Sequence, residues 1–350
     1  MSKRHEHGHS HGGQFDIGRR DFLCHCCVGG VVTAAMLASI NTPAQAGAVT
    51  FKATHGTGLC NLAIFLAHKR KYAEPDGVNL EFVNAPAVAD ITTIFGSGQV
   101  DISSIPYSNF YTLYDKGAPV KIISGTGAEG CVIVAQPGID SAEKVRGKTL
   151  GTFQADTLEV LPYDWLKAHG VKWTDVDVRF FNTSPEMAQA FIAGNVDAIC
   201  HIEPYATQAL HGVPGAVILS DGTDIYKKRY TDCVIAASER VINSYRKEVK
   251  VLLKALMVAQ RDAERDRVSA CKDTVGTYYK TDFDTLLDAS TKQFLMIDQH
   301  DNEQFMIERS QSMVELGYIK KPVDKATFDW SLLDEVIAEN REMYRSLIVT

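Results

Sequence analysis

The residues best suited to metal chemistry are concentrated close to the N-terminus. The sequence CHCC at positions 24–27 combines three cysteines with a histidine, and HEHGHSHGG at positions 5–13 contributes four more histidines. Thiolate and imidazole are the usual ligands of zinc, but a site also needs a packed scaffold that holds them about 2.0–2.3 Å from one ion. The sequence that surrounds CHCC does not indicate such a scaffold.

The same segment instead has the three parts of an export signal. Basic residues come first, the apolar stretch CVGGVVTAAMLASI follows at 27–40, and the small residues Ala44 and Ala46 precede Gly47. The pair Arg19-Arg20, followed by Asp-Phe-Leu, is similar to a twin-arginine export signal. We therefore predict that residues 1–46 are a removed signal peptide and that the mature protein is periplasmic. Loose metal binding by the histidine tract stays open as an alternative.

The remaining cysteines are far apart along the chain. No Cys-x-x-Cys pair occurs among them, which argues against zinc fingers and iron–sulfur clusters. In an oxidising compartment one or two disulfides could form, and the alternative is that each cysteine is a small buried apolar residue. The sequence leaves open which of them pair: Cys60, Cys131, Cys200, Cys233 and Cys271.

Composition excludes several classes of function. Of the 350 residues, 45% are hydrophobic and 23% are charged, and the net charge is −7. A nucleic-acid partner is not expected, because tight binding to nucleic acid needs a concentrated positive field. No apolar run reaches the roughly 20 residues of a membrane-spanning helix. The chain also has no Gly-x-Ser-x-Gly elbow and no phosphate-binding loop signature, so no cofactor and no enzyme activity are expected.

Short apolar runs alternate with amphipathic helical patterns over the first two thirds of the mature chain. This alternation predicts an α/β fold in which helices cover a mainly parallel sheet. From residue 235 onward the pattern is nearly all helical. We predict strands at 48–54, 78–85, 100–105, 120–126, 147–153, 176–183, 196–202 and 216–222.

Two segments of the chain resemble each other. ITTIFGSGQVDISSIPY (91–107) and MAQAFIAGNVDAICHIEPY (187–205) share a helix, a Gly-(Gln/Asn)-Val-Asp turn, an apolar strand and a Pro-Tyr pair. They are too far apart for the short repeat of a solenoid. The sequence therefore predicts two similar α/β lobes.

These features together resemble the substrate-binding proteins of ABC transporters, in the branch that binds sulfonates, taurine, nitrate and thiamine pyrimidine precursors. The resemblance rests on the order of the twin-arginine leader, the turn at 98–102, GKTLGTF at 147–153, AGNVDAICHIEPYATQA at 193–209 and the helical tail. It implies a two-lobed type II periplasmic-binding-protein fold with a helical C-terminal segment. One departure is His201, which stands where relatives often carry tryptophan.

The resemblance also implies a domain division and partners. Residues 47–137 would form the first part of lobe one, 138–232 lobe two, and 233–350 the return to lobe one with the C-terminal helices. The protein would be a monomer that captures a small anionic or heterocyclic solute and passes it to an ABC permease in the inner membrane. Two alternatives stay open: an enzyme on the same scaffold related to pyrimidine synthesis, and a ligand-sensing subunit of a signalling system.

Ligands of open α/β sheets bind beyond the carboxyl ends of the strands. This rule selects the loops at 54–58, 103–109, 124–130, 152–157 and 200–205. Glycines there would let backbone amides approach a ligand, and helix N-termini would favour an anion. For each residue the alternative is a structural role in a turn, a cap or the core. The candidate ligand-binding residues are His55, Thr57, Asn61, Ser104, Tyr107, Thr126, Thr152, Gln154, Thr157, His201, Glu203 and Tyr205.

A metal site in the cleft is a further alternative, although we assign no metal ligand from the sequence. His55, Cys60, Cys131, Cys200 and His201 all lie at predicted strand ends or at the helix starts beside them. If the lobes brought several of them together, these soft ligands would suit zinc or copper.

Overall fold

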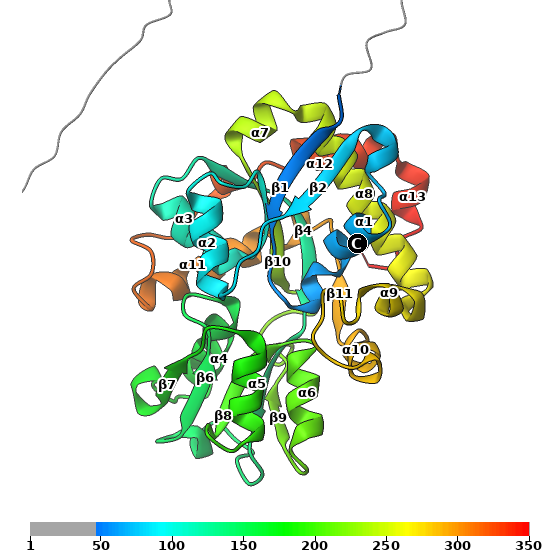
Figure 1. Ribbon diagram of the computed structural model, residues 1–350. Helices are drawn as coiled ribbons and strands as arrows, with labels where there is room; N and C mark the ends of the chain where they lie inside the picture. Colours follow the sequence, from blue (N-terminus) through cyan, green and yellow to red (C-terminus); the bar gives the residue numbers. More distant parts are fainter. Residues whose placement is uncertain (1–46, 350) are drawn as a thin grey trace, which may run out of the picture. The chain divides into compact units, whose positions relative to one another are not determined.

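The computed structural model describes residues 47–349, and the signal peptide predicted for residues 1–46 lies outside the described residues. The described chain forms two β-sheets, one above the other in Figure 1, each covered by helices. Within this range no helix combines the length and the apolar character that crossing a membrane requires.

The first sheet has six strands in the order β11-β4-β10-β3-β1-β2. β1 runs parallel to both of its neighbours, whereas β10 runs antiparallel to β3 and to β4. β10 is buried from Thr231 to Ala237, and its β-branched residues Val234 and Ile235 suit a central strand. The strands are β1 (Val49–Thr54), β2 (Val78–Phe82), β3 (Ile102–Pro106), β4 (Val120–Glu129), β10 (Thr231–Ser238) and β11 (Gln293–Leu295).

The second sheet has five strands in the order β7-β6-β8-β5-β9. β6 is parallel to β7 and β8, and β5 is antiparallel to β8 and β9. All five residues of β5 and all five of β8 are buried, as expected for strands with helices on both faces. The strands are β5 (Cys131–Ala135), β6 (Thr149–Thr152), β7 (Asp177–Phe180), β8 (Ala198–Ile202) and β9 (Val217–Ser220).

The chain passes between the sheets twice. The first crossing is at Glu129 and Gly130, which both have left-handed backbone angles (φ +60° and +85°), and the second lies between β9 and β10. We call the first sheet with its helices lobe one, and residues 131–220 lobe two. β5, which the sequence-based division assigned to the first lobe, is a strand of the second sheet.

Helices cover both sheets. The longest, α8, is amphipathic: Val249, Leu252, Leu253 and Leu256 recur at helical spacing and are buried. Lobe two contains α4 (Thr157–Ala168), α5 (Ser184–Ile192) and α6 (Tyr205–Gly212). Lobe one contains α1 (Leu62–Lys69), α2 (Val88–Gly96), α3 (Tyr107–Asp115), α7 (Glu239–Ser244), α8 (Arg246–Arg265), α9 (Arg267–Thr274), α10 (Phe283–Ala289), α11 (Glu303–Glu315), α12 (Ser331–Glu339) and α13 (Arg341–Arg345).

Single turns of 3-10 helix complete the element order. The turn η1 follows β1 directly and leads into α1, so it places Cys60 and Asn61 at the carboxyl end of that strand. The turns are η1 (Leu59–Asn61), η2 (Glu74–Asp76), η3 (Glu143–Val145), η4 (Trp173–Asp175), η5 (His300–Asn302) and η6 (Lys325–Thr327).

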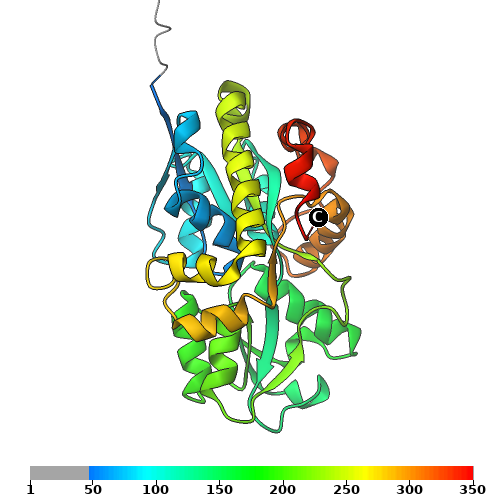
Figure 2. The same cartoon turned by 90° about the vertical axis from the view of Figure 1, so that its right-hand side faces the viewer.

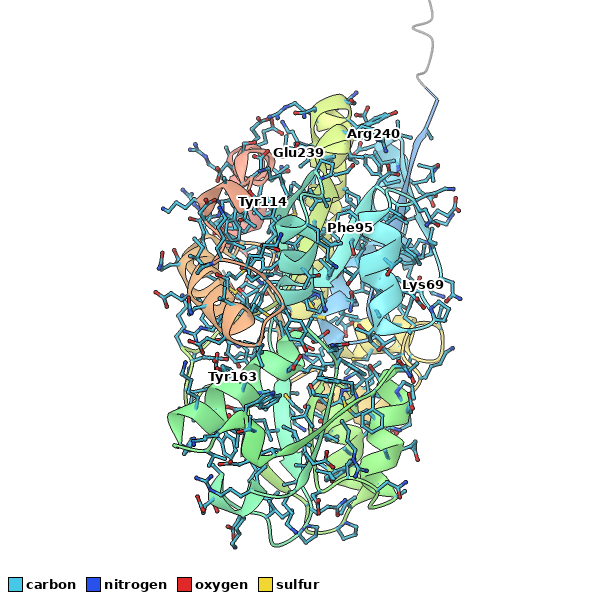
Figure 3. All side chains as sticks on the ribbon, turned by 90° about the vertical axis from the view of Figure 1, so that its left-hand side faces the viewer. Lys69, Phe95, Tyr114, Tyr163, Glu239 and Arg240 are labelled. Carbon is cyan, nitrogen blue, oxygen red and sulfur yellow. The ribbon has the colours of Figure 1, made fainter. Side chains whose placement is uncertain are left out.

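Two C-terminal helices of lobe one also contact lobe two. Arg309 of α11 donates to the carboxylate of Asp164 of α4 at 2.8 Å, and Tyr163 of α4, labelled in Figure 3, donates to Glu315 of α11 at 2.7 Å. At the other side of the molecule α10 packs on α6, and Figure 2 shows α9 and α10 leading from α8 towards the helices of lobe two. Contacts with lobe two therefore flank the junction of the lobes on two sides.

The two-lobed α/β fold predicted from the sequence is confirmed, but the prediction of mainly parallel sheets is wrong. Both sheets are mixed, because the two crossing segments insert β5 and β10 antiparallel to their neighbours. β5, β10 and the short β11 are not among the predicted strands. The sequence TDCVIAAS of β10 holds the apolar run CVIAA but runs straight into a helix, and a short apolar run of this kind does not distinguish a strand from a buried helical segment.

Candidate functional site

A small cavity lies between the lobes at the carboxyl ends of the parallel strands. Its volume is about 40 Å³, room for a few water molecules or one small ligand. It is enclosed by the loop after β1, the end of β3, the loop from β6 into α4, the end of β8 and the first residues of β10. The lining residues are Gly56, Cys60, Asn61, Val88, Ile91, Ser104, Pro106, Phe153, Asp156, Leu158, Ser184, Ile202, Asp232 and Cys233.

Hydrogen bonds join the lobes directly around this cavity. Thr57 of lobe one donates through its hydroxyl to Ser184 Oγ of lobe two at 2.8 Å. The backbone N–H of Leu59 donates to the carbonyl of Glu203 at 2.7 Å. Both bonds connect the loop after β1 to the strand ends of lobe two. These contacts beside the cavity would break if the lobes separated.

Three thiols and a carboxylate meet on one side of the cavity. Cys60 Sγ lies 2.8 Å from Cys233 Sγ, and the Cys233 thiol donates to Asp232 Oδ2 at 3.1 Å. From lobe two, the Cys131 thiol donates to Asp232 Oδ1 at 3.4 Å and the Thr157 hydroxyl donates to the same oxygen at 2.8 Å. Cys60, Asp232 and Cys233 are close enough together to ligate one metal ion.

Burial controls the protonation of these groups. It raises the pKa of the Cys60 thiol to about 12 and that of the Cys233 thiol well above its ordinary value, so both thiols carry their protons at neutral pH. It also raises the pKa of the Asp156 carboxyl to about 7 and that of Asp232 above its ordinary range. No lysine or arginine lines the cavity within the described part of the chain.

Two of the predicted site residues that line the cavity also carry a buried polar atom that has no partner. The side-chain carbonyl of Asn61 and the hydroxyl of Ser104 are both buried without a hydrogen bond. The Asn61 amide nitrogen donates to the carbonyl of Gly58 at 3.0 Å, which turns its oxygen away from that loop. These two oxygens are acceptors that a ligand could use.

Other predicted residues near the cavity make hydrogen bonds between the lobes or to the backbone of lining residues. Thr57 and Thr157 make the contacts between lobes described above. The Thr126 hydroxyl donates to the carbonyl of Cys60 at 2.7 Å, and the Thr152 hydroxyl donates to the carbonyl of Leu158 at 2.7 Å. Each hydroxyl positions the backbone of a lining residue.

The predicted histidines and tyrosines are packed against neighbouring side chains. His55 lies edge-on between Phe65 and Phe82, with both ring centroids 4.6 Å away. His201 accepts at Nδ1 from Ile202 N–H and donates from Nε2 to the carbonyl of Ser184, and burial lowers its pKa to about 4. Tyr205 stacks on His201, Tyr107 packs against Tyr111, and both tyrosines are buried.

The remaining two candidates differ sharply in exposure. Glu203 is fully buried and accepts from the backbone N–H and the hydroxyl of Thr207 at 3.0 and 2.9 Å. Burial raises the pKa of its carboxyl to about 7. Gln154 is exposed on the loop into α4. Ligand binding by all twelve candidates stays a prediction.

Sequence reasoning did not select four polar lining residues: Asp156, Ser184, Asp232 and Cys233. Asp156 caps α4 by accepting from Leu158 N–H at 3.0 Å; the sequence predicts the cap of this helix at Asp156 or Thr157, although it does not assign Asp156 to the site. Asp232 and Cys233 lie on the strand that was not predicted. Of the five residues in the metal-binding alternative, only Cys60 lies in the cluster of three possible ligands found among the described residues. The other four do not: His55, Cys131, Cys200 and His201.

Comparison with known proteins settles the family. Residues 57–273 match the NMT1-like family, which is more than half of the chain. The protein belongs to the NMT1-like family. No curated protein matches the chain.

Solved structures of other proteins share the fold of this NMT1-like protein. The periplasmic aliphatic sulphonate binding protein SsuA of Escherichia coli superposes with a TM-score of 0.68 at 18% identity, over 81% of this chain and 92% of SsuA. The periplasmic nitrate-binding protein NrtA of Synechocystis PCC 6803 gives 0.70 at 17% identity, over 86% and 91%. A zinc-bound ligand-binding component of an ABC-type import system from Staphylococcus aureus gives 0.72 at 15% identity, over 82% and 98%. The resemblance to this branch is confirmed at the level of family and fold.

Proposed function

We propose that this protein is the periplasmic solute-binding component of an ABC import system, acting as a monomer that closes on a small solute and delivers it to a permease in the inner membrane. The observation that carries the proposal is the cavity lined by two α/β lobes, beside which direct hydrogen bonds join one lobe to the other. The resemblance to SsuA and NrtA supports the same role. Export through the twin-arginine route is part of the proposal and rests on Arg19 and Arg20.

The lining of the cavity narrows the class of solute. Asp156 and Asp232 contribute two carboxylates, and no cationic side chain of the described residues lines the space. An anion there would have no cationic partner and would disfavour the ionised form of both carboxyl groups. The proposal therefore favours a neutral or cationic solute over the anion expected from the glycine-rich loops.

The protonation of the thiols supports a binding role without catalysis. A cysteine nucleophile needs a lowered pKa or an adjacent base, and burial gives Cys60 the opposite, a pKa of about 12. His201 uses both ring nitrogens in hydrogen bonds to the backbone, so it cannot act as that base without breaking one of them. We propose that the solute leaves the cleft chemically unchanged.

A solute screen tests the role. The full chain is mixed with neutral and cationic solutes, sulfonates, nitrate and pyrimidines, and melting temperature and radius of gyration are recorded. The proposal expects one solute to raise the melting temperature and to change the radius of gyration, and expects N61A/S104A to weaken binding about ten-fold or more. S108A is the matched control, because Ser108 is another buried serine without a partner but does not line the cavity. Chemical conversion of the solute, or equal binding by N61A/S104A, would contradict the proposal.

A further inference from the structure

Cys60, Asp232 and Cys233 form a group of ligands assembled from distant parts of the chain. One sulfur or carboxylate atom of each lies within 4.8 Å of the others, and all three residues are buried. Cys60 is on η1, held there by the hydroxyl of Thr126, whereas Asp232 and Cys233 begin β10. The two cysteines are 173 residues apart in the sequence, so only the fold brings them together.

The carboxylate of Asp232 has no cationic partner among the described residues, although its side chain is buried. Its hydrogen-bond donors are neutral: the Thr157 hydroxyl, the Gln293 amide at 3.0 Å and the thiols of Cys131 and Cys233. Buried charges are normally paired with an opposite charge or with a metal. A metal ion bonded to the Asp232 carboxylate would replace neutral hydrogen-bond donors with a coordinate bond.

A disulfide between the two cysteines would satisfy this site less well. It would consume the Cys233 thiol that donates to Asp232 and leave the carboxylate with one donor fewer. It would also leave unchanged the two unpaired acceptors in the same cavity, Asn61 Oδ1 and Ser104 Oγ, each on a side chain that is 1% exposed. These oxygens indicate that the cavity holds a group able to donate hydrogen bonds or to be coordinated.

We propose that Cys60, Cys233 and Asp232 bind a thiophilic metal cation, with Cu(I) as the ion that fits best. Thiolate ligands select Cu(I) and Zn(II); a zinc ion held by these three residues would need water or another molecule as its fourth ligand, whereas Cu(I) is stable with two or three ligands. Binding breaks two S–H bonds, forms two metal–sulfur bonds and releases two protons to solvent, with no oxidation or reduction. At metal–sulfur distances of about 2.3 Å the two sulfurs must move apart by about 1 Å. The inference deepens the proposed function by naming the class of solute. It rests on the proposed function only in treating the metal as the transported solute.

The test is Cu(I) uptake by the reduced full chain under anaerobic conditions, in competition with the chromophoric chelator bathocuproine disulfonate. We expect C60S/C233S to bind one equivalent less than the wild type, and D232N to bind the same ion at least about ten-fold more weakly. The matched control is C200S/C271S, which also removes two buried thiols but leaves the cluster intact. The residues 1–46 are present in every variant, so their contribution cancels in the comparison.

Two results would overturn the metal site. One is equal Cu(I) stoichiometry in the wild type and in C60S/C233S with unchanged circular dichroism. The other is equal Cu(I) affinity of the wild type and D232N, which keeps the test decisive if C60S/C233S fails to fold. The solute screen and the Cu(I) assay, both carried out on the wild type, separate the two proposals. A solute-dependent shift without Cu(I) uptake by the wild type rejects the metal site alone, whereas Cu(I) uptake without any change in the radius of gyration rejects the transport role alone.

Discussion

Residues 91–107 of lobe one and 187–205 of lobe two are built on one pattern but end in different chemistry. Each starts with a helix, α2 or α5, that stops at a glycine with a left-handed backbone, Gly98 at φ +76° and Gly194 at φ +72°. Each then enters a strand, β3 or β8, and continues through a Pro-Tyr pair into α3 or α6. The left-handed turn explains the glycine at both sites, since other residues rarely adopt that conformation.

The aspartate after each glycine has the same role in both lobes. Asp101 accepts from the backbone N–H of Lys52 on β1 at 3.0 Å, and Asp197 accepts from the N–H of Thr149 on β6 at 2.9 Å. In both cases the aspartate fastens the start of its own strand to the neighbouring parallel strand. The repeated Gly-x-Val-Asp sequence is therefore a structural device.

The polar residues at the strand ends differ. In lobe one, Ser104 lines the cavity and its buried hydroxyl has no partner. In lobe two, Glu203 and His201 are both hydrogen-bonded within the protein. The comparison teaches that the same backbone pattern carries a potential ligand contact in lobe one and an internal support in lobe two. The predictions below test this division.

The largest effect is expected from E203A. Two buried donors, the N–H and the hydroxyl of Thr207, lose their acceptor, and a small cavity remains. We expect the free energy of unfolding at pH 6 to fall by about 3 kcal/mol, measured by urea denaturation. E203Q, which keeps one acceptor oxygen, should lose less than half as much. A loss below about 0.5 kcal/mol for E203A would show that Glu203 is not a structural support.

The pH dependence of stability should carry the signature of Glu203. Burial raises the pKa of its carboxyl from 4.5 to about 7, so between these values the folded state holds a proton that the unfolded state has released. The stabilisation is complete below pH 4.5 and is lost as the pH rises through 7. We expect the stability of the wild type relative to E203Q to fall by up to about 3 kcal/mol between pH 4.5 and 8. A difference that does not change with pH would refute this assignment.

His201 should give the opposite slope. Burial lowers its pKa from 6.5 to about 4, so the unfolded state takes up a proton first as the pH falls. The wild type should lose stability relative to H201Q from pH 6.5 down to 4, by up to about 3 kcal/mol in the same denaturation series. If the wild type instead gained stability relative to H201Q on acidification, His201 would be charged in the folded protein.

The two aspartates should differ in degree. Asp197 accepts from the N–H and from the hydroxyl of Thr149, whereas Asp101 accepts from one backbone N–H on an exposed strand residue and pairs with Arg240. We expect D197A to cost about 2 kcal/mol and D101A about 1 kcal/mol in thermal or urea unfolding. A larger loss of stability for D101A than for D197A would show that these hydrogen bonds do not account for the role of the two aspartates.

The smallest effect on stability is expected from S104A. Its hydroxyl has no partner to lose, so the free energy of unfolding should change by less than about 0.5 kcal/mol, as for S108A. Only S104A should also weaken solute binding, measured by isothermal titration calorimetry. Equal effects of S104A and S108A on affinity would remove Ser104 from the site.

Sequence reasoning located most of the elements because their signals are local. Each of these signals is contained in a stretch of about ten residues: the glycine turns, the N-terminal cap of α4 and each strand or helix pattern. β10 lacked such a signal: its place between β3 and β4 depends on the return of the chain from lobe two. The prediction of mainly parallel sheets was wrong for the same reason, because the directions of β5 and β10 follow from the two crossings between the sheets.

The site was harder to predict than the fold. The rule that ligands bind at strand ends selected Asn61 and Ser104, which do line the cavity. It also selected His55 and Tyr107, which pack in part against aromatic rings farther along the chain, Phe82 and Phe305. Asp232 and Cys233 were missed because their contacts with Thr157 and Cys60 span 75 and 173 residues.

Native mass spectrometry of the full chain purified from cells tests most directly the claim that the lobes close around a small ligand. The wild type, N61A/S104A and S108A are compared under native and denaturing conditions. We predict a bound mass of a small molecule or metal ion on the wild type and S108A that is lost on denaturation and is depleted in N61A/S104A. The same occupancy in all three proteins would contradict the assignment of the ligand to this cavity.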